Sequence, residues 1–164
     1  MKYRPFECLR LSLLLGSLLS SSSMVYAESA QPLDFSETKY EKEWRVVYEF
    51  RKSEIEETVK NAKDMDYGEK KVTISIAVAD LDHDGRDDIL AFLDHPFLCG
   101  SWGCELIILL AKPDGDWQLG LEGVHTGKPV LLSRSQTKGF TDIILGESIW
   151  KWNGTAYHFS GKVK

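Results

Sequence analysis

The residues with the clearest capacity for chemistry are five aspartates within the nine residues from Asp80 to Asp88. Four of them hold the positions at which a calcium-binding loop places side-chain ligands: Asp80, Asp82, Asp84 and Asp88. Calcium takes about six to eight oxygen ligands, and the backbone carbonyl of Arg86 would supply one more from the seventh position of the loop. Gly85 permits the sharp turn that a side chain would obstruct. We therefore expect a calcium site at 80–88; a solvated acidic turn and a site for another metal are the alternatives.

The residues on either side of this loop distinguish it from an EF-hand. An EF-hand would place a glutamate at position 12 and lie between two helices, whereas position 12 here is Ala91 and the flanking residues 72–79 and 89–93 are apolar and β-rich. The segment resembles the strand-loop-strand calcium sites of FG-GAP and VCBS-type repeats, which follow the pattern D-x-D-x-D-G-x-x-D and then an apolar strand. The resemblance implies a structural calcium site in which the four aspartates are ligands and Arg86 provides its carbonyl. The sequence has no second copy of the unit, so a complete propeller is not expected.

Two cysteines, Cys99 and Cys104, enclose the short segment Gly-Ser-Trp-Gly. The third, Cys8, lies in an N-terminal segment that we expect to be removed. An even pair in an exported protein indicates a disulfide; redox chemistry, for which a two-residue spacing is usual, and metal ligation are the alternatives. Trp102, inside this ring, is the candidate partner contact, because a large side chain on a rigid loop has little freedom left to lose on binding. Its indole could instead fold back over the disulfide.

The first 27 residues have the order of charged, apolar and small segments that is typical of a secretory signal peptide. Lys2, Arg4 and Arg10 come first, the apolar run 11–19 follows, and cleavage is expected after Ala27. The run is too short to span a membrane comfortably, so we expect a periplasmic or secreted protein with no membrane anchor after cleavage; a retained anchor is the alternative. Residues 28–35 are expected to form a flexible leader, and residues 36–164 a single domain.

The charge balance excludes some classes of partner. The chain has 20 Lys and Arg residues and 25 Asp and Glu residues. Cleavage after residue 27 would remove three basic residues and one acidic residue and change the formal net charge from −5 to −7. An acidic domain is a poor binder of nucleic acid and of anionic membrane surfaces. We therefore expect a protein or glycan partner in the cell envelope.

The hydrophobic pattern predicts an α+β fold, with an N-terminal helical segment packed on an antiparallel β-sheet. Over residues 36–63 apolar side chains recur at helical spacing, and Ser53 with Glu56 forms a capping-box pattern, so either one helix or two could cover this stretch. Residues 45–50 could alternatively form a strand. From residue 71 onward a meander is expected, with strands at 72–79, 89–94, 105–111, 117–121, 130–132, 140–145, 149–152 and 155–159. The run at 105–111 is apolar nearly throughout, as a central strand buried on both faces would be.

The chain ends in two aromatic runs around Asn153-Gly154, the preferred pair for a two-residue hairpin turn. That turn would set Trp152 opposite Thr155 and Trp150 opposite Tyr157. The aromatic residues of the hairpin are expected to pack against the core. The alternative is a platform for a sugar or a peptide.

No motif in the sequence joins a nucleophile to its base. Three histidines stand singly, without the spacing of paired ligands: His95, His125 and His158. A pocket that joined one of the last two to Glu122 or Glu147 would indicate a small periplasmic hydrolase, whereas an exposed apolar patch around Trp102 would indicate a binding protein. We expect a non-enzymatic binding module, such as an inhibitor or immunity-type partner of another envelope protein. A hydrolase and a structural fragment of an envelope assembly are the alternatives.

Overall fold

The computed structural model describes residues 30–65, 71–127 and 129–163. The expected signal peptide, residues 1–27, and the first two residues of the expected leader lie outside this part of the chain. No helix among the described residues is long and apolar enough to cross a membrane.

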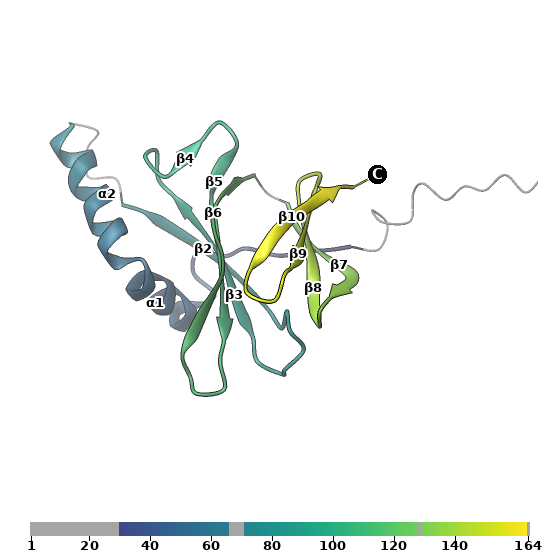
Figure 1. Ribbon diagram of the computed structural model, residues 1–164. Helices are drawn as coiled ribbons and strands as arrows, with labels where there is room; N and C mark the ends of the chain where they lie inside the picture. The colour runs from purple at the N-terminus through teal and green to yellow at the C-terminus, as the bar shows by residue number, and fades with distance from the viewer. Residues whose placement is uncertain (1–29, 66–70, 128, 164) are drawn as a thin grey trace, which may run out of the picture.

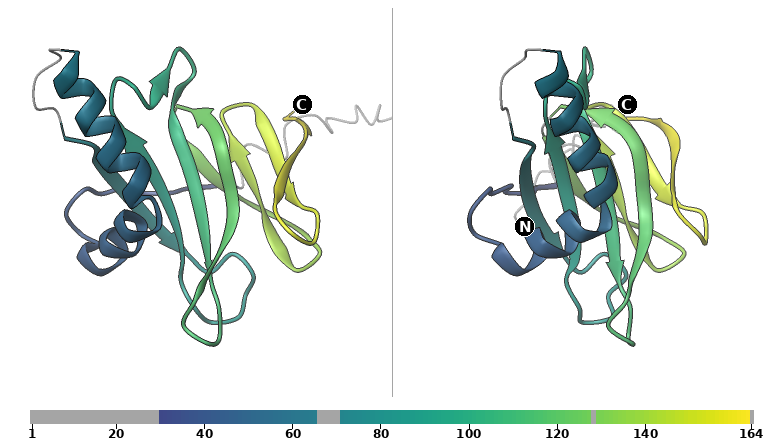
Figure 2. Two further views of the ribbon diagram at one scale, coloured as in Figure 1. Left: turned by 60° about the vertical axis from the view of Figure 1, so that its left-hand side comes forward. Right: turned by 90° about the vertical axis from the view of Figure 1, so that its left-hand side faces the viewer.

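The described residues form a helical layer and two antiparallel sheets (Figure 1). The central sheet contains β2 (Thr73–Ala79), β3 (Asp88–Asp94), β4 (Cys99–Gly100), β5 (Gly103–Ala111) and β6 (Trp117–Thr126). The terminal sheet contains, in spatial order, β1 (Gln31–Pro32), β7 (Val130–Thr137), β8 (Phe140–Leu145), β9 (Ser148–Trp152) and β10 (Tyr157–Lys162). The helices α1 (Glu41–Phe50) and α2 (Lys52–Asp64) cover one face of the central sheet, and the terminal sheet packs on the other (Figure 2). The α+β prediction is therefore confirmed, with the strands divided between two sheets.

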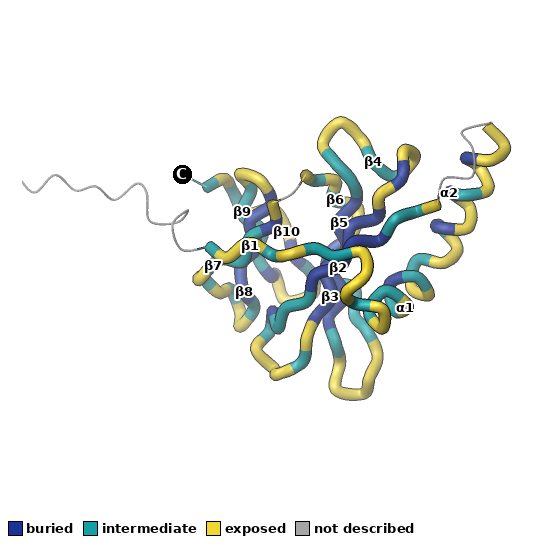
Figure 3. The backbone as a smooth tube through the Cα atoms, turned by 180° about the vertical axis from the view of Figure 1, so that it is seen from behind, coloured by how far each residue is buried: buried dark blue, intermediate teal, exposed yellow. Residues whose placement is uncertain are grey.

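The alternation of side chains along the central strands explains these three layers. In β3, Leu90 and Phe92 belong to the core shared with the terminal sheet, while Ile89, Ala91 and Leu93 belong to the core under the helices. The apolar residues of β5 alternate between the same two cores, and its interior is buried throughout (Figure 3). The prediction of a central strand buried on both faces is confirmed, because such a strand needs apolar residues at every position.

The helical segment is divided at Arg51 into two helices. The second helix begins at Lys52 and has no side-chain cap, so the predicted capping box of Ser53 and Glu56 is wrong. Residues 45–50 are helical and do not form the alternative strand.

The Arg51 guanidinium takes part in a partly buried ion network where the two helices meet. It donates to Glu105 of β5 at 2.9 Å, pairs with Glu54, and lies 3.6 Å from the Glu122 carboxylate of β6. Glu105 is only 6% exposed, and its other oxygen accepts the N–H of Gly123 at 3.0 Å. The network therefore joins the helical layer to two strands of the central sheet.

The segment expected to be a flexible leader contributes to both sheets. Its residues Gln31–Pro32 form β1 and pair with Leu131 and Leu132 of β7. Ser36 then bridges Ile76 of β2 through two backbone hydrogen bonds of 2.8 Å. Residues 31–36 thus connect the edges of the two sheets, which local composition does not reveal.

The terminal hairpin has a longer turn than its Asn-Gly pair predicts. The Asn153 side chain accepts two backbone hydrogen bonds from within the turn, at 2.8 and 3.0 Å. These bonds favour a four-residue loop over residues 153–156 in place of a two-residue turn. Trp152 therefore pairs with Tyr157, and both are buried in the core, so the predicted Trp150–Tyr157 pair is wrong.

Candidate functional site

The acidic loop connects β2 to β3, at the end of the central sheet opposite the disulfide turn (Figure 1). Leu81 anchors it, because its side chain is fully buried and its carbonyl accepts the N–H of Thr141 in β8 at 2.8 Å. His83 Nε2 lies 3.1 Å from the hydroxyl of Thr141 and 2.8 Å from the amide nitrogen of Gln136. The strand-loop-strand arrangement was expected, but the contacts with the terminal sheet had no signal in the sequence.

Three aspartates of the loop come together in a cluster that could hold a metal ion. One carboxylate oxygen from each of Asp80, Asp82 and Asp88 lies within 4.8 Å of the others. Asp88 is only 1% exposed, and its two oxygens accept the backbone N–H groups of Leu81 at 2.9 Å and Ala111 at 2.8 Å. These bonds hold the buried carboxylate in place and connect the loop to the end of β5.

Asp84 and Arg86 interact with each other beside this cluster. The Arg86 guanidinium pairs with the Asp84 carboxylate and donates through Nε to the carbonyl of Ala111 at 3.3 Å. Gly85 has a φ of 86°, the left-handed conformation expected of it, and donates its N–H to Asp80 at 3.0 Å. The structure thus brings together three of the four aspartates expected as ligands and leaves Asp84 in an ion pair.

The carboxylates of the cluster disfavour one another's charge. Burial raises the pKa of Asp88 to about 6, although two backbone N–H groups favour its charged form. Burial, and then the charges of Asp84 and Asp80, raise the pKa of Asp82. A divalent cation would remove this cost, and an all-oxygen donor set suits hard cations such as calcium and magnesium.

The raised pKa of Asp88 predicts that the metal-free domain loses stability as the pH rises. The carboxyl group has a pKa of 3.8 in its unperturbed state and of about 6 in the folded protein. Between these values the folded state holds a proton that the unfolded state has lost. The free energy of unfolding should therefore fall as the pH rises through this window, by about 3 kcal/mol in total. Urea denaturation in EDTA would measure the decrease, and a bound cation should oppose it.

The matched control for this prediction is Asp88→Asn. Its amide does not titrate, so the stability change that belongs to residue 88 should disappear. The variant should also be less stable overall, because its NH₂ group would face one of the two backbone donors, Leu81 or Ala111. A wild-type stability that does not fall relative to the variant would contradict the pKa assignment.

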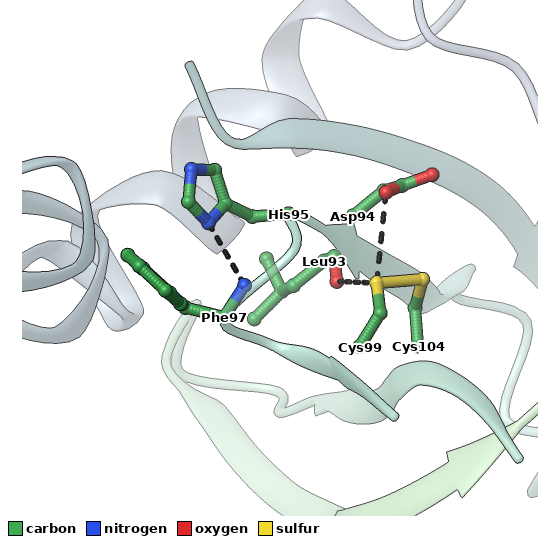
Figure 4. Close-up of a disulfide and its surroundings, with 6 residues drawn as sticks. All are labelled: Leu93, Asp94, His95, Phe97, Cys99 and Cys104. Carbon is green, nitrogen blue, oxygen red and sulfur yellow. Dashed lines mark hydrogen bonds between the residues drawn. A yellow bond between two sulfur atoms is a disulfide. The ribbon is translucent and has the colours of Figure 1, made fainter. Parts of the chain in front are cut away.

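The disulfide between Cys99 and Cys104 is present as predicted, with an S–S distance of 2.09 Å (Figure 4). It joins opposed residues of β4 and β5, and Cys99 Sγ lies 3.5 Å from the carboxylate of Asp94. Both sulfurs are bonded to each other, so this group of Asp94 and two cysteines has no thiolate to offer a metal. The buried His95 lies beside the turn, and its carbonyl accepts the N–H of Cys99 at 2.9 Å. Its backbone therefore helps to hold the turn.

Trp102, at the tip of the disulfide turn, is 82% exposed. Its indole therefore does not fold back over the disulfide. The side chain borders a cleft of about 560 Å³ whose walls come from both sheets. The β4–β5 turn and β6 contribute one wall, and the β8–β9 turn, β9 and the end of β10 contribute the other. The lining residues with aromatic, charged or hydrogen-bonding side chains include Trp102, His125, Thr126, Glu147, Trp150 and Lys162.

The cleft also brings together His125 and Glu147, one of the pairs whose meeting in a pocket would indicate a hydrolase. Among the described residues, no hydrogen bond joins these two side chains. Glu122 instead lies near Arg51, and His158 is exposed on β10 outside the cleft. His125 and Glu147 were both candidates from the sequence, but the sequence could not show that they lie in one cleft, because β6 and the β8–β9 turn belong to different sheets.

Comparisons with known protein families, with curated proteins and with solved structures found no match to this chain. Function must therefore follow from the acidic loop, the disulfide turn and the cleft. The loop has carboxylate oxygens that could hold a metal ion, and the turn presents an exposed indole at the border of the cleft. The acidic loop lies at the start of β3, and the disulfide turn lies beyond its other end (Figure 1).

Proposed function

We propose that the protein is an exported, non-enzymatic binding module whose partner binds at the cleft beside Trp102. The observation that carries this proposal is an indole that is 82% exposed on a turn closed by a disulfide. Large aromatic side chains often supply much of the energy at binding surfaces, and a turn already held by a covalent bond loses little entropy when a partner binds. The partner is a protein or glycan of the cell envelope. With a protein partner, the module would act as an inhibitor or immunity protein.

Export to the periplasm or the medium is part of this proposal. It is supported by the charged, apolar and small-residue order of residues 1–27 and by the Cys99–Cys104 disulfide. Disulfides persist mainly in oxidising compartments outside the cytoplasm.

We propose calcium as the ion held by the acidic loop, in a structural site of the FG-GAP or VCBS type. The cluster of three aspartates supports this, and the Arg86 carbonyl would add a further oxygen. Asp84 would have to leave the Arg86 guanidinium to join them. Because Leu81 and His83 connect the loop to the terminal sheet, neutralising the cluster would stabilise the packing of the two sheets that form the cleft.

Affinity capture from an envelope fraction tests the binding role. Wild-type protein should retain its partner, and Trp102→Ala should weaken binding about thirtyfold, the loss typical of a central aromatic contact. Phe50→Ala is the matched control, because Phe50 is also an exposed aromatic but lies on α1. Equal capture by the wild type and by Trp102→Ala would show that the cleft is not the binding site.

A small periplasmic hydrolase is the second candidate, favoured by the presence of His125 and Glu147 in one cleft. These side chains could act as a general base and a general acid. Turnover of the bound partner that is lost in His125→Ala, while binding remains, would support this candidate over the binding module.

A further inference from the structure

We propose that the cleft binds an uncharged oligosaccharide, an inference that rests on the proposed binding role of Trp102. The cleft combines two indole rings with side chains that donate and accept hydrogen bonds. Such a mixture matches a ligand that has apolar ring faces and many hydroxyl groups.

Each wall of the cleft carries one indole. Trp102 comes from the β4–β5 turn of the central sheet, and Trp150 comes from β9 of the terminal sheet. Trp150 is held by an edge-to-face contact with Phe159, with ring centroids 6.2 Å apart and an angle of 74° between the planes. The C–H groups on one face of a sugar ring carry partial positive charge and complement the negative face of an indole. The Trp150 ring is held before binding by Phe159, and the backbone that carries Trp102 is held by the disulfide, so both would contact sugars at reduced entropic cost.

The polar side chains of the cleft suit hydroxyl groups. Ser148 and His125 can each donate or accept a hydrogen bond, Thr126 can accept while its hydroxyl donates to the carbonyl of Gly127 at 3.2 Å, Lys162 donates, and Glu147 accepts. A sugar hydroxyl also does both, so it can bond with any member of this set. An apolar ligand would leave several of these groups without partners.

The charges of the cleft disfavour ionic ligands. Among the lining residues that the structure describes, the ammonium of Lys162 is balanced by the carboxylate of Glu147. Phosphate and polyanionic ligands are usually bound by clusters of cationic side chains, and quaternary ammonium ligands by aromatic cages without a competing ammonium. An uncharged ligand agrees best with this balance.

The size of the cleft favours a saccharide over a folded protein. Its volume of about 560 Å³ lies within the range of small-ligand sites, about 300–1,000 Å³. A stable protein partner would instead cover about 800 Å² of surface on each side. A chain of a few sugar rings can enter the cleft and leave the rest of the surface free.

The test is an array of neutral oligosaccharides built from glucose, galactose, mannose and N-acetylglucosamine, followed by calorimetric titration with a member that binds. Wild-type protein should bind saturably, Trp102→Ala should bind at least about tenfold more weakly, and Trp102→Phe should recover part of the loss. The affinity should change less than about twofold between about 50 and 500 mM NaCl, because salt does not screen an uncharged ligand. Phe50→Ala should bind as the wild type does.

Three outcomes separate this inference from the proposed function. If no neutral oligosaccharide binds but envelope capture still depends on Trp102, the saccharide inference is wrong and the binding role remains, with a protein as partner. If neither oligosaccharide binding nor envelope capture depends on Trp102, both the saccharide inference and the proposed binding site are wrong. Binding only to an anionic chain such as polygalacturonate, with a steep salt dependence, would also overturn the inference.

Discussion

Calcium should raise the melting temperature of the domain, and Asp82→Ala should abolish the increase. Binding to the folded state alone adds about 4 kcal/mol to the free energy of unfolding when free calcium is a thousandfold above its Kd. For a domain of this size the melting temperature would rise by at least about 8 °C. Asp82 contributes an oxygen to the cluster, and burial and then nearby carboxylates raise its pKa, so its removal takes away a ligand and relieves both burial of charge and repulsion. The metal-free variant should therefore lose little stability.

Two variants in the same loop act as controls for the calcium prediction. Asp87→Ala removes an aspartate that is exposed and outside the cluster, so it should keep the full response. Asp84→Ala should keep part of it, because Asp84 pairs with Arg86 beside the cluster. Thermal unfolding in EDTA and in calcium would measure all of these effects. Identical curves for the wild type in the two buffers would remove calcium from the proposed function.

Arg51→Ala should destabilise the protein by about 3–5 kcal/mol, the largest effect that we expect of any single substitution. The reason is the buried carboxylate of Glu105, which would lose its counter-charge while staying in the core. Arg45→Ala is the matched control, because the Arg45 side chain is 71% exposed and pairs with Glu41 on the same helix. It should change stability little. Guanidinium denaturation of the two variants would measure the difference.

A second substitution identifies the cause of that loss. Glu105→Gln in the Arg51→Ala background removes the buried charge and keeps an oxygen that can accept the N–H of Gly123. Stability should therefore recover in part, and the double-mutant cycle should show strong coupling between the two sites. If Arg51→Ala were as mild as Arg45→Ala, the ion network would add little to the apolar core that packs the helices on the sheet.

Local pattern was sufficient for the features that depend on neighbouring residues. The continuous apolar run of β5 predicted a strand buried on both faces, and it separates two cores. The even pair of cysteines in a chain expected to be exported predicted a disulfide, and Cys99 and Cys104 are opposed in adjacent strands. The position of Gly85 predicted the sharp turn of the acidic loop. The burial of β5 and the turn at Gly85 follow from side-chain alternation and from backbone conformation over a few residues.

Local pattern failed where a distant residue or a single side chain decides between conformations. The Asn-Gly pair predicted a two-residue turn, but the hydrogen bonds of the Asn153 side chain close a longer one and move the register by two residues. The capping-box pattern at Ser53 was not used: the second helix begins at Lys52, before Ser53, and Arg51 at the helix junction binds Glu105 far along the chain. The contact between Arg51 and Glu105 is absent from any short window of sequence, whereas the Asn153 bonds are local but are not part of the Asn-Gly pattern.

The sequence by itself determined which residues could do chemistry: crowded aspartates between two strands, a cysteine pair and a tryptophan on the turn between them. Only the tertiary structure decided which of them meet. It placed Asp84 with Arg86, and it brought Trp102, His125 and Glu147 to one cleft. The physical reason is that the cleft has one wall from each sheet, and the two sheets are held together by a buried core of residues that are remote in sequence.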